Sequence, residues 1–169
     1  MPTSFNVPIQ AFFRRVERDT DFFNYYNVDS NEAMSLASEQ AYGYLIESIS
    51  DVINRGSPDI DFNDFTVNED NNGIHSGEFN FDLTQNEVNL LAQLMYEKYF
   101  NRDFVKLRAF KLQLSPTDLN VFSPANERAT FISMYDQVRS ESIRMLDDYA
   151  SHDRVTGKLK TIDYEKYGE

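Results

Sequence analysis

The stretch FNFDLTQNEVNLLAQLMYEKY, residues 79–99, decides the fold, because its hydrophobic period changes within a few residues from that of a strand to that of a helix. Phe79, Phe81 and Leu83 alternate with polar residues, as in a half-buried strand. Thr84 and Glu87 then form a capping box, in which each side chain accepts a hydrogen bond from the backbone amide of the other. We therefore predict a strand followed directly by a helix. The predicted buried face of this helix comprises Val88, Leu90, Leu91, Ala92, Leu94, Met95 and Tyr99.

The stretch before this helix is predicted to form a β-hairpin over about residues 59–83. Ile60, Phe62 and Val67 lie on the first arm, and the alternating residues from Phe79 to Leu83 form the second. The connection, residues 68–77, is longer than a tight turn and rich in Asn, Asp and Gly, which tolerate a left-handed backbone. The pattern after the hairpin fits both a helix that bends near residues 101–103 and one that runs on through Leu112.

Three further helices are predicted from their ends. A short amphipathic helix has Pro8 at its first position, where a missing amide hydrogen is tolerated. A second helix has Asp29 as its N-cap and ends near Gly56. A third has Pro124 at its first position and runs to about Ser151. Near-heptad spacing gives this third helix a seam of Ala125, Arg128, Ile132, Tyr135, Val138, Ser142, Met145 and Tyr149.

These elements predict a mainly α protein, with a helical bundle core, a β-hairpin insertion and an extended C-terminal tail. A chain of 169 residues fits one domain, which we place at residues 1–151. Residues 152–169 lose the helical period and contain Gly157 and Gly168, so we expect an extended C-terminal arm there.

Composition narrows the classes of function. The net charge of −12 opposes attraction to a nucleic acid backbone. The chain has no cysteine, which excludes disulfides and thiolate sites and suits a reducing cytoplasm. The N-terminus lacks the pattern of a signal peptide, and no window approaches the ~20 apolar residues that a membrane span needs. We therefore expect neither export by that route nor insertion into a membrane.

The sequence gives only weak indications of catalytic or metal-binding motifs. His75 and His152 have no partner at metal-ligand spacing, and carboxylate pairs such as Asp147 with Asp148 are common on acidic surfaces. No phosphate-binding glycine loop or nucleophile elbow occurs in the sequence. We therefore predict no catalytic residues, no metal site and no cofactor.

Aromatic and aliphatic residues in two segments are instead predicted to bind partner proteins. The dense run of aromatic residues near residue 22 is expected to pack on a neighbouring element or on a partner. The tail has apolar side chains that suit a partner groove or a sheet edge. The predicted partner-binding residues are Phe22, Phe23, Tyr25 and Tyr26 in the first segment and Leu159, Ile162, Tyr164 and Tyr167 in the second.

Three stretches together resemble the head-tail adaptor (connector, or head completion) proteins of tailed bacteriophages. They are residues 12–53, 79–104 and 118–149, which cover most of the chain. The passage from Phe79 through Thr84 into the Leu91–Met95 segment is similar to the strand-to-helix entry of adaptors from phages of Gram-positive hosts, as is the passage from Asp118 to Ala125 into the last helix.

This resemblance implies a structural virion protein located in the neck, at the portal vertex of the capsid, and assembled in the cytoplasm of the host bacterium. Such a protein forms a ring, usually of twelve copies, beneath the portal protein ring, and contacts the next neck or tail protein. DNA passes through the ring without specific binding. The main alternative is a bacterial helical protein-interaction or regulatory module, and a hydrolase that uses surface carboxylates is the third hypothesis.

Overall fold

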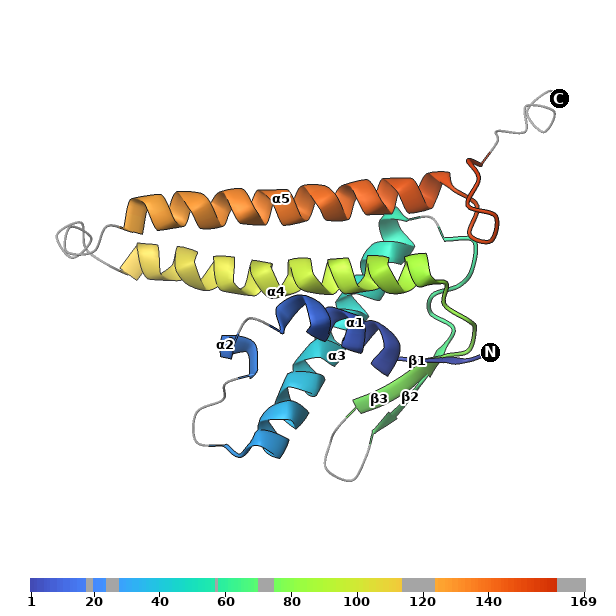
Figure 1. Ribbon diagram of the computed structural model, residues 1–169, viewed down its shortest axis with the longest axis horizontal. Coiled ribbons are helices and arrows are strands. Elements are labelled where there is room, and N and C mark those ends of the chain that lie inside the picture. Colours follow the sequence, from blue (N-terminus) through green and yellow to red (C-terminus); the bar gives the residue numbers. More distant parts are fainter. Residues whose placement is uncertain (18–19, 24–27, 57, 70–74, 114–123, 161–169) are drawn as a thin grey trace.

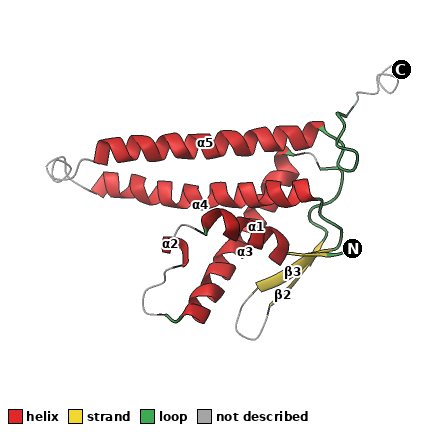
Figure 2. Cartoon of the chain, in the orientation of Figure 1, coloured by secondary structure: helices red, strands yellow, loops and turns green. Residues whose placement is uncertain are grey.

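The computed structural model describes residues 1–17, 20–23, 28–56, 58–69, 75–113 and 124–160. Helices make up most of it, and a small sheet lies at one side (Figure 2), which confirms a mainly α fold with a β-hairpin insertion. The elements, in chain order, are β1 (Thr3–Ser4), α1 (Asn6–Val16), α2 (Thr20–Phe23), α3 (Ser30–Arg55), β2 (Phe65–Glu69), β3 (His75–Phe79), α4 (Gln85–Gln113) and α5 (Pro124–Ser151).

α4 is the central helix of the core. α5 packs along one side of it, and α1 and α3 pack on the other (Figure 1). Residues 90–95 are all buried, so the helix is covered on more than one side, as its wide apolar stripe predicts. α4 is continuous from Gln85 to Gln113, which is the unbent alternative of the two that the sequence allowed. An ion pair of 2.6 Å between Lys98 Nζ and Asp51 Oδ2 also joins α4 to α3.

α3 has a side-chain N-cap, whereas Phe5, the residue before α1, forms no side-chain cap hydrogen bond. Asp29 Oδ1 accepts hydrogen bonds from the amides of Asn31 and Glu32, at 2.8 and 2.9 Å, which confirms the predicted cap of α3. α1 begins at Asn6 rather than at Pro8, so the proline lies inside the first turn. That shift has little cost, because first-turn amides have no partner within the helix.

The sheet has the order β1-β3-β2 and is antiparallel throughout. The predicted hairpin exists, but its strands lie nearer the connection than expected, with Phe65 opposite Phe79 and Glu69 opposite His75. The apolar alternation before Phe65 has another cause, because the Phe62 ring is fully buried in the core and does not belong to a strand. The sequence also missed β1, since two residues are too few to show a period.

α5 is a peripheral helix that contacts α4 and, more weakly, α3. Ser142 and Leu146 are its buried residues among the side chains described, whereas Ile132 is 45% exposed. The predicted seam is therefore wrong at Ile132 and omits Leu146. The physical reason is that α5 packs mainly on α4, which extends with it past α1 and α3 (Figure 1), so a side chain of α5 that does not face α4 stays exposed. Within the described residues, no helix combines the length and apolarity required to cross a bilayer.

Candidate functional site

Glu87, at the start of α4, is the centre of the most connected polar site that we find. Its side chain is fully buried. The predicted capping box is present: Glu87 Oε2 accepts from the Thr84 amide at 2.7 Å, and the Glu87 amide donates to Thr84 Oγ1 at 3.3 Å. The carboxylate thus helps to start α4, and it also holds groups from the C-terminal part of the chain.

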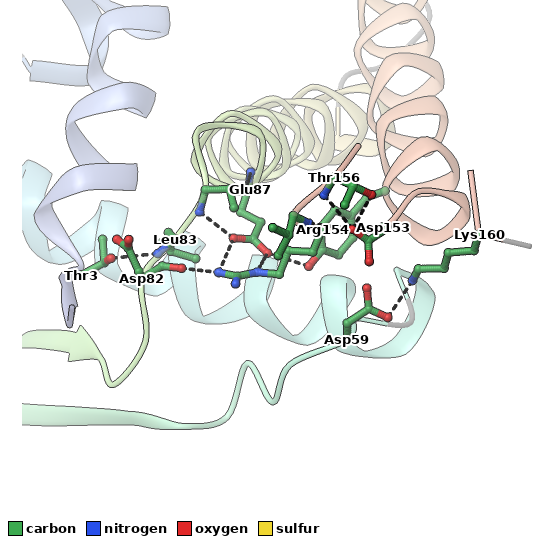
Figure 3. Close-up of polar contacts among 12 residues, drawn as sticks. Thr3, Asp59, Asp82, Leu83, Glu87, Asp153, Arg154, Thr156 and Lys160 are labelled. Carbon is green, nitrogen blue, oxygen red and sulfur yellow. Dashed lines mark hydrogen bonds and ion pairs between the residues drawn. The ribbon is translucent and has the colours of Figure 1, made fainter. Parts of the chain in front are cut away.

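Arg154 neutralises this buried carboxylate. Its Nε and Nη2 atoms donate to the two oxygens of Glu87 at 2.6 and 3.0 Å, and Nη2 also donates to the carbonyl of Asp82 (Figure 3). Bonds from one guanidinium to both carboxylate oxygens are among the strong hydrogen bonds in proteins. The hydrogen bond to Glu87 raises the pKa of Arg154. A buried carboxylate needs such a partner, because an uncompensated charge in the interior is costly.

Tyr149, on the last turn of α5, completes the cluster. Its hydroxyl donates to Glu87 Oε1 at 2.8 Å. Burial raises the pKa of Tyr149 well above its usual value, and the hydrogen bond to Glu87 raises it further. The hydroxyl therefore remains a neutral donor. Glu87, Arg154 and Tyr149 are named the Glu87 cluster here, and they join the start of α4, the end of α5 and the segment after it.

Residues 152–160 form a compact turn that is held to the body of the protein. Asp153 Oδ1 accepts from the backbone amide and the hydroxyl of Thr156, both at 2.7 Å. Gly157 has a φ of 65°, the left-handed conformation that glycine adopts readily. Lys160 Nζ forms an ion pair with Asp59 Oδ1 at 2.9 Å (Figure 3). The domain boundary predicted after Ser151 is therefore corrected, because the folded structure continues to Lys160.

The N-terminus reaches the same region. Thr3 Oγ1 accepts a hydrogen bond of 2.9 Å from the amide of Leu83, the residue before the capping box (Figure 3). Residues near both ends of the described chain are thereby attached to the segment in which α4 begins.

An open pocket of about 370 Å³ lies next to the Glu87 cluster, between the start of α4, the end of α5 and the C-terminal turn. We call it the C-terminal pocket. Among the residues that line it are Leu90, Met145, Asp148, Tyr149, His152 and Asp153.

The structure separates the predicted partner-binding residues. Phe22 is 2% exposed and packs against Phe12 at a centroid distance of 5.4 Å, so it is a core residue rather than part of an exposed surface. Phe23 is partly buried against the same core. Leu159, in contrast, is 67% exposed. Tyr25, Tyr26, Ile162, Tyr164 and Tyr167 lie outside the described residues.

The sequence predicted the cap formed by Glu87 but not its cluster. Glu87 and Arg154 are 67 residues apart, and no local pattern links them. A signal for the C-terminal turn was present, since an Asp followed by Thr and Gly is typical of a side-chain-capped turn. A second contact was also missed: His75 Nδ1 lies 2.6 Å from Glu39 Oε1, and the His75 ring stacks on Tyr42.

Within the part of the chain that the structure describes, no group of three or more His, Asp or Glu residues could hold a metal ion. Comparison with protein-family models, with curated proteins and with solved structures finds no match to this chain.

Proposed function

We propose that this protein is a head-tail adaptor of a tailed bacteriophage, which forms a ring beneath the portal and links it to the next neck or tail protein. The observation that carries the proposal is the placement of the two ends of the described fold. The tip of the α4–α5 pair lies at one end of the long axis, and the C-terminal turn lies at the other (Figure 1). A protein that connects two structures needs contact surfaces at both ends.

The part of the protein between these two ends is suited to a subunit of a ring. The core joins α1, α3 and α4 through closely packed rings and aliphatic side chains, so the two ends keep a fixed relative position. Neighbours in a ring meet through two different surfaces, and the ring closes when the rotation per subunit is correct. The net charge of −12 agrees with a channel through which DNA passes without adhering. The resemblance of three sequence stretches to adaptor proteins supports the same function.

The test is to mix the full-length protein with purified rings of the portal protein encoded in the same genome. Electron microscopy should show added density at one end of the portal ring, and sedimentation should show a heavier complex. Rings that remain bare at every mixing ratio would exclude the adaptor function. A protein-interaction module that has another partner would give this negative result while remaining folded.

The C-terminal turn decides how a tail variant must be designed. A chain that ends at His152 loses Arg154 and leaves the carboxylate of Glu87 buried without its cation. A chain that ends at Lys160 keeps the Glu87 cluster and the ion pair to Asp59. We expect the second variant to unfold like the full-length protein and to lose attachment to the portal ring. Undiminished attachment would show that residues 161–169 take no part in docking.

A further inference from the structure

The C-terminal pocket combines an apolar floor with an acidic rim. Leu90 is 2% exposed, and Met145 and the Tyr149 ring, which are both partly buried, line the pocket beside it. Asp148, from α5, and Asp153, from the C-terminal turn, line it as well, and both carboxylates belong to surface residues. A ligand that enters this pocket therefore meets hydrocarbon below and negative charge at the edge.

The charges of the lining residues favour a cation. Arg154 also lines the pocket, but its Nε and Nη2 atoms are bound to Glu87 and to the carbonyl of Asp82. Its charge is thus balanced by a carboxylate that is fully buried. Asp148 has only a weak pairing with Arg144 at 3.6 Å, in which both side chains are more than half exposed.

Asp153 adds a second carboxylate, and Lys160, whose charge also acts on it, is itself paired with Asp59 at 2.9 Å. Its Oδ1 atom accepts the hydrogen bonds from Val155 and Thr156, whereas Oδ2 receives none from the residues that the structure describes. Donation from Thr156 lowers the pKa of Asp153, so this group is ionised at neutral pH. An anionic ligand would meet these two carboxylates and an arginine whose charge is already balanced by Glu87.

We propose that the C-terminal pocket binds the side chain of one lysine or arginine presented by a partner protein. The methylene groups of that side chain would pack on Leu90, Met145 and Tyr149, while its charged end lies between Asp148 and Asp153. Long basic side chains have this division into an apolar stem and a charged head. The volume of about 370 Å³ is near the lower limit for small-molecule sites, and the pocket is open to solvent, which suits one inserted side chain.

This proposal deepens the adaptor function, because it gives the chemistry by which a neighbouring protein docks at the end where the chain leaves α5. Its test uses no portal protein, so its failure and that of the adaptor function are distinguishable. The probe is N-acetyl-arginine amide, titrated into the full-length, isotope-labelled protein and followed by two-dimensional NMR of the backbone amides. N-acetyl-citrulline amide has nearly the same shape without the charge and is the control ligand.

We expect arginine to shift the amide signals of residues that line the pocket, such as Asn86, Arg154 and Gly157, and citrulline to shift them much less. Asp148→Asn should weaken arginine binding by about two- to fivefold, the effect of one exposed charge. Asp147→Asn is the matched control, since Asp147 is the exposed neighbour that does not line the pocket. Equal shifts with citrulline, equal losses in both variants, or no shift at these amides would each overturn the proposal.

Discussion

Removing the cation from the Glu87 cluster is the sharpest test of how the C-terminal turn is held. In Arg154→Met the hydrocarbon part of the side chain remains, but the carboxylate of Glu87 loses the bonds of 2.6 and 3.0 Å from the guanidinium. In the wild type this carboxylate is fully buried, and the Thr84 amide and the Tyr149 hydroxyl, which also bond to it, remain in the variant. The variant therefore creates an interior charge whose partners are neutral dipoles.

Breaking a buried ion pair from one side typically costs about 3–5 kcal/mol. The side chain of Arg154 is 17% exposed and two neutral donors remain, so we expect a loss near the lower value, about 3 kcal/mol in the free energy of unfolding. In a protein of this size such a loss lowers the melting temperature by about 6–12 °C. Glu87→Gln should cost about 2 kcal/mol, because it removes the charge but keeps the shape of the side chain.

The assay is chemical denaturation followed by circular dichroism, for the wild type, both single variants and the double variant. The double variant has no unpaired interior charge, so its loss should be smaller than the sum of the single losses by at least about 1.5 kcal/mol. Arg144→Met is the control, because Arg144 is 67% exposed and its ion pairs with Glu141 and Asp148 should together contribute no more than about 0.5 kcal/mol.

A cost of less than about 1 kcal/mol for Arg154→Met, or two single losses that add within about 0.5 kcal/mol, would contradict the prediction. Either result would mean that the Glu87–Arg154 pair is not formed in solution.

Three further predictions concern the core, the sheet and the C-terminal turn. Phe22→Ala should lower the free energy of unfolding, measured by urea denaturation, by about 3–5 kcal/mol, because the ring is buried. Leu159→Ala should change it by less than about 0.5 kcal/mol, because that side chain is exposed. Gly77→Ala should lower the melting temperature, because the added Cβ would lie 2.7 Å from the ring of Phe5. Gly43→Ala should raise it, because a Cβ added there in α3 meets nothing within 4 Å and alanine favours the helix. In a pH series followed by NMR, the carboxyl of Asp153 should titrate below its ordinary pKa of 3.8. The stability that this group contributes is therefore present above pH 3.8 and is lost as the pH falls through the lowered pKa. Titration at or above 3.8 would contradict the turn hydrogen bonds.

Secondary structure followed from the sequence wherever its causes are local. The N-cap at Asp29 and the capping box at Thr84 depend on residues at most three apart, and the buried face of α4 depends on a period that neighbouring side chains display. Ile60 and Phe62 were misread as part of a strand, because a period of two shows which residues are buried and not what covers them. Phe22 was expected to pack either on a neighbouring element or on a partner, and the structure places it on Phe12 of α1, a choice that no local pattern displays.

The sequence by itself therefore determined a mainly helical, cysteine-free, acidic protein with a hairpin between its helices, and it identified Glu87 as a helix cap. The tertiary structure alone decided that Glu87 is also the buried partner of Arg154 and Tyr149, and that the C-terminal pocket lies beside them. Caps and periods arise from backbone bonds within one turn, which the sequence displays directly. A contact across 67 residues depends on how the helices pack, and packing is set by all the side chains of the core at once.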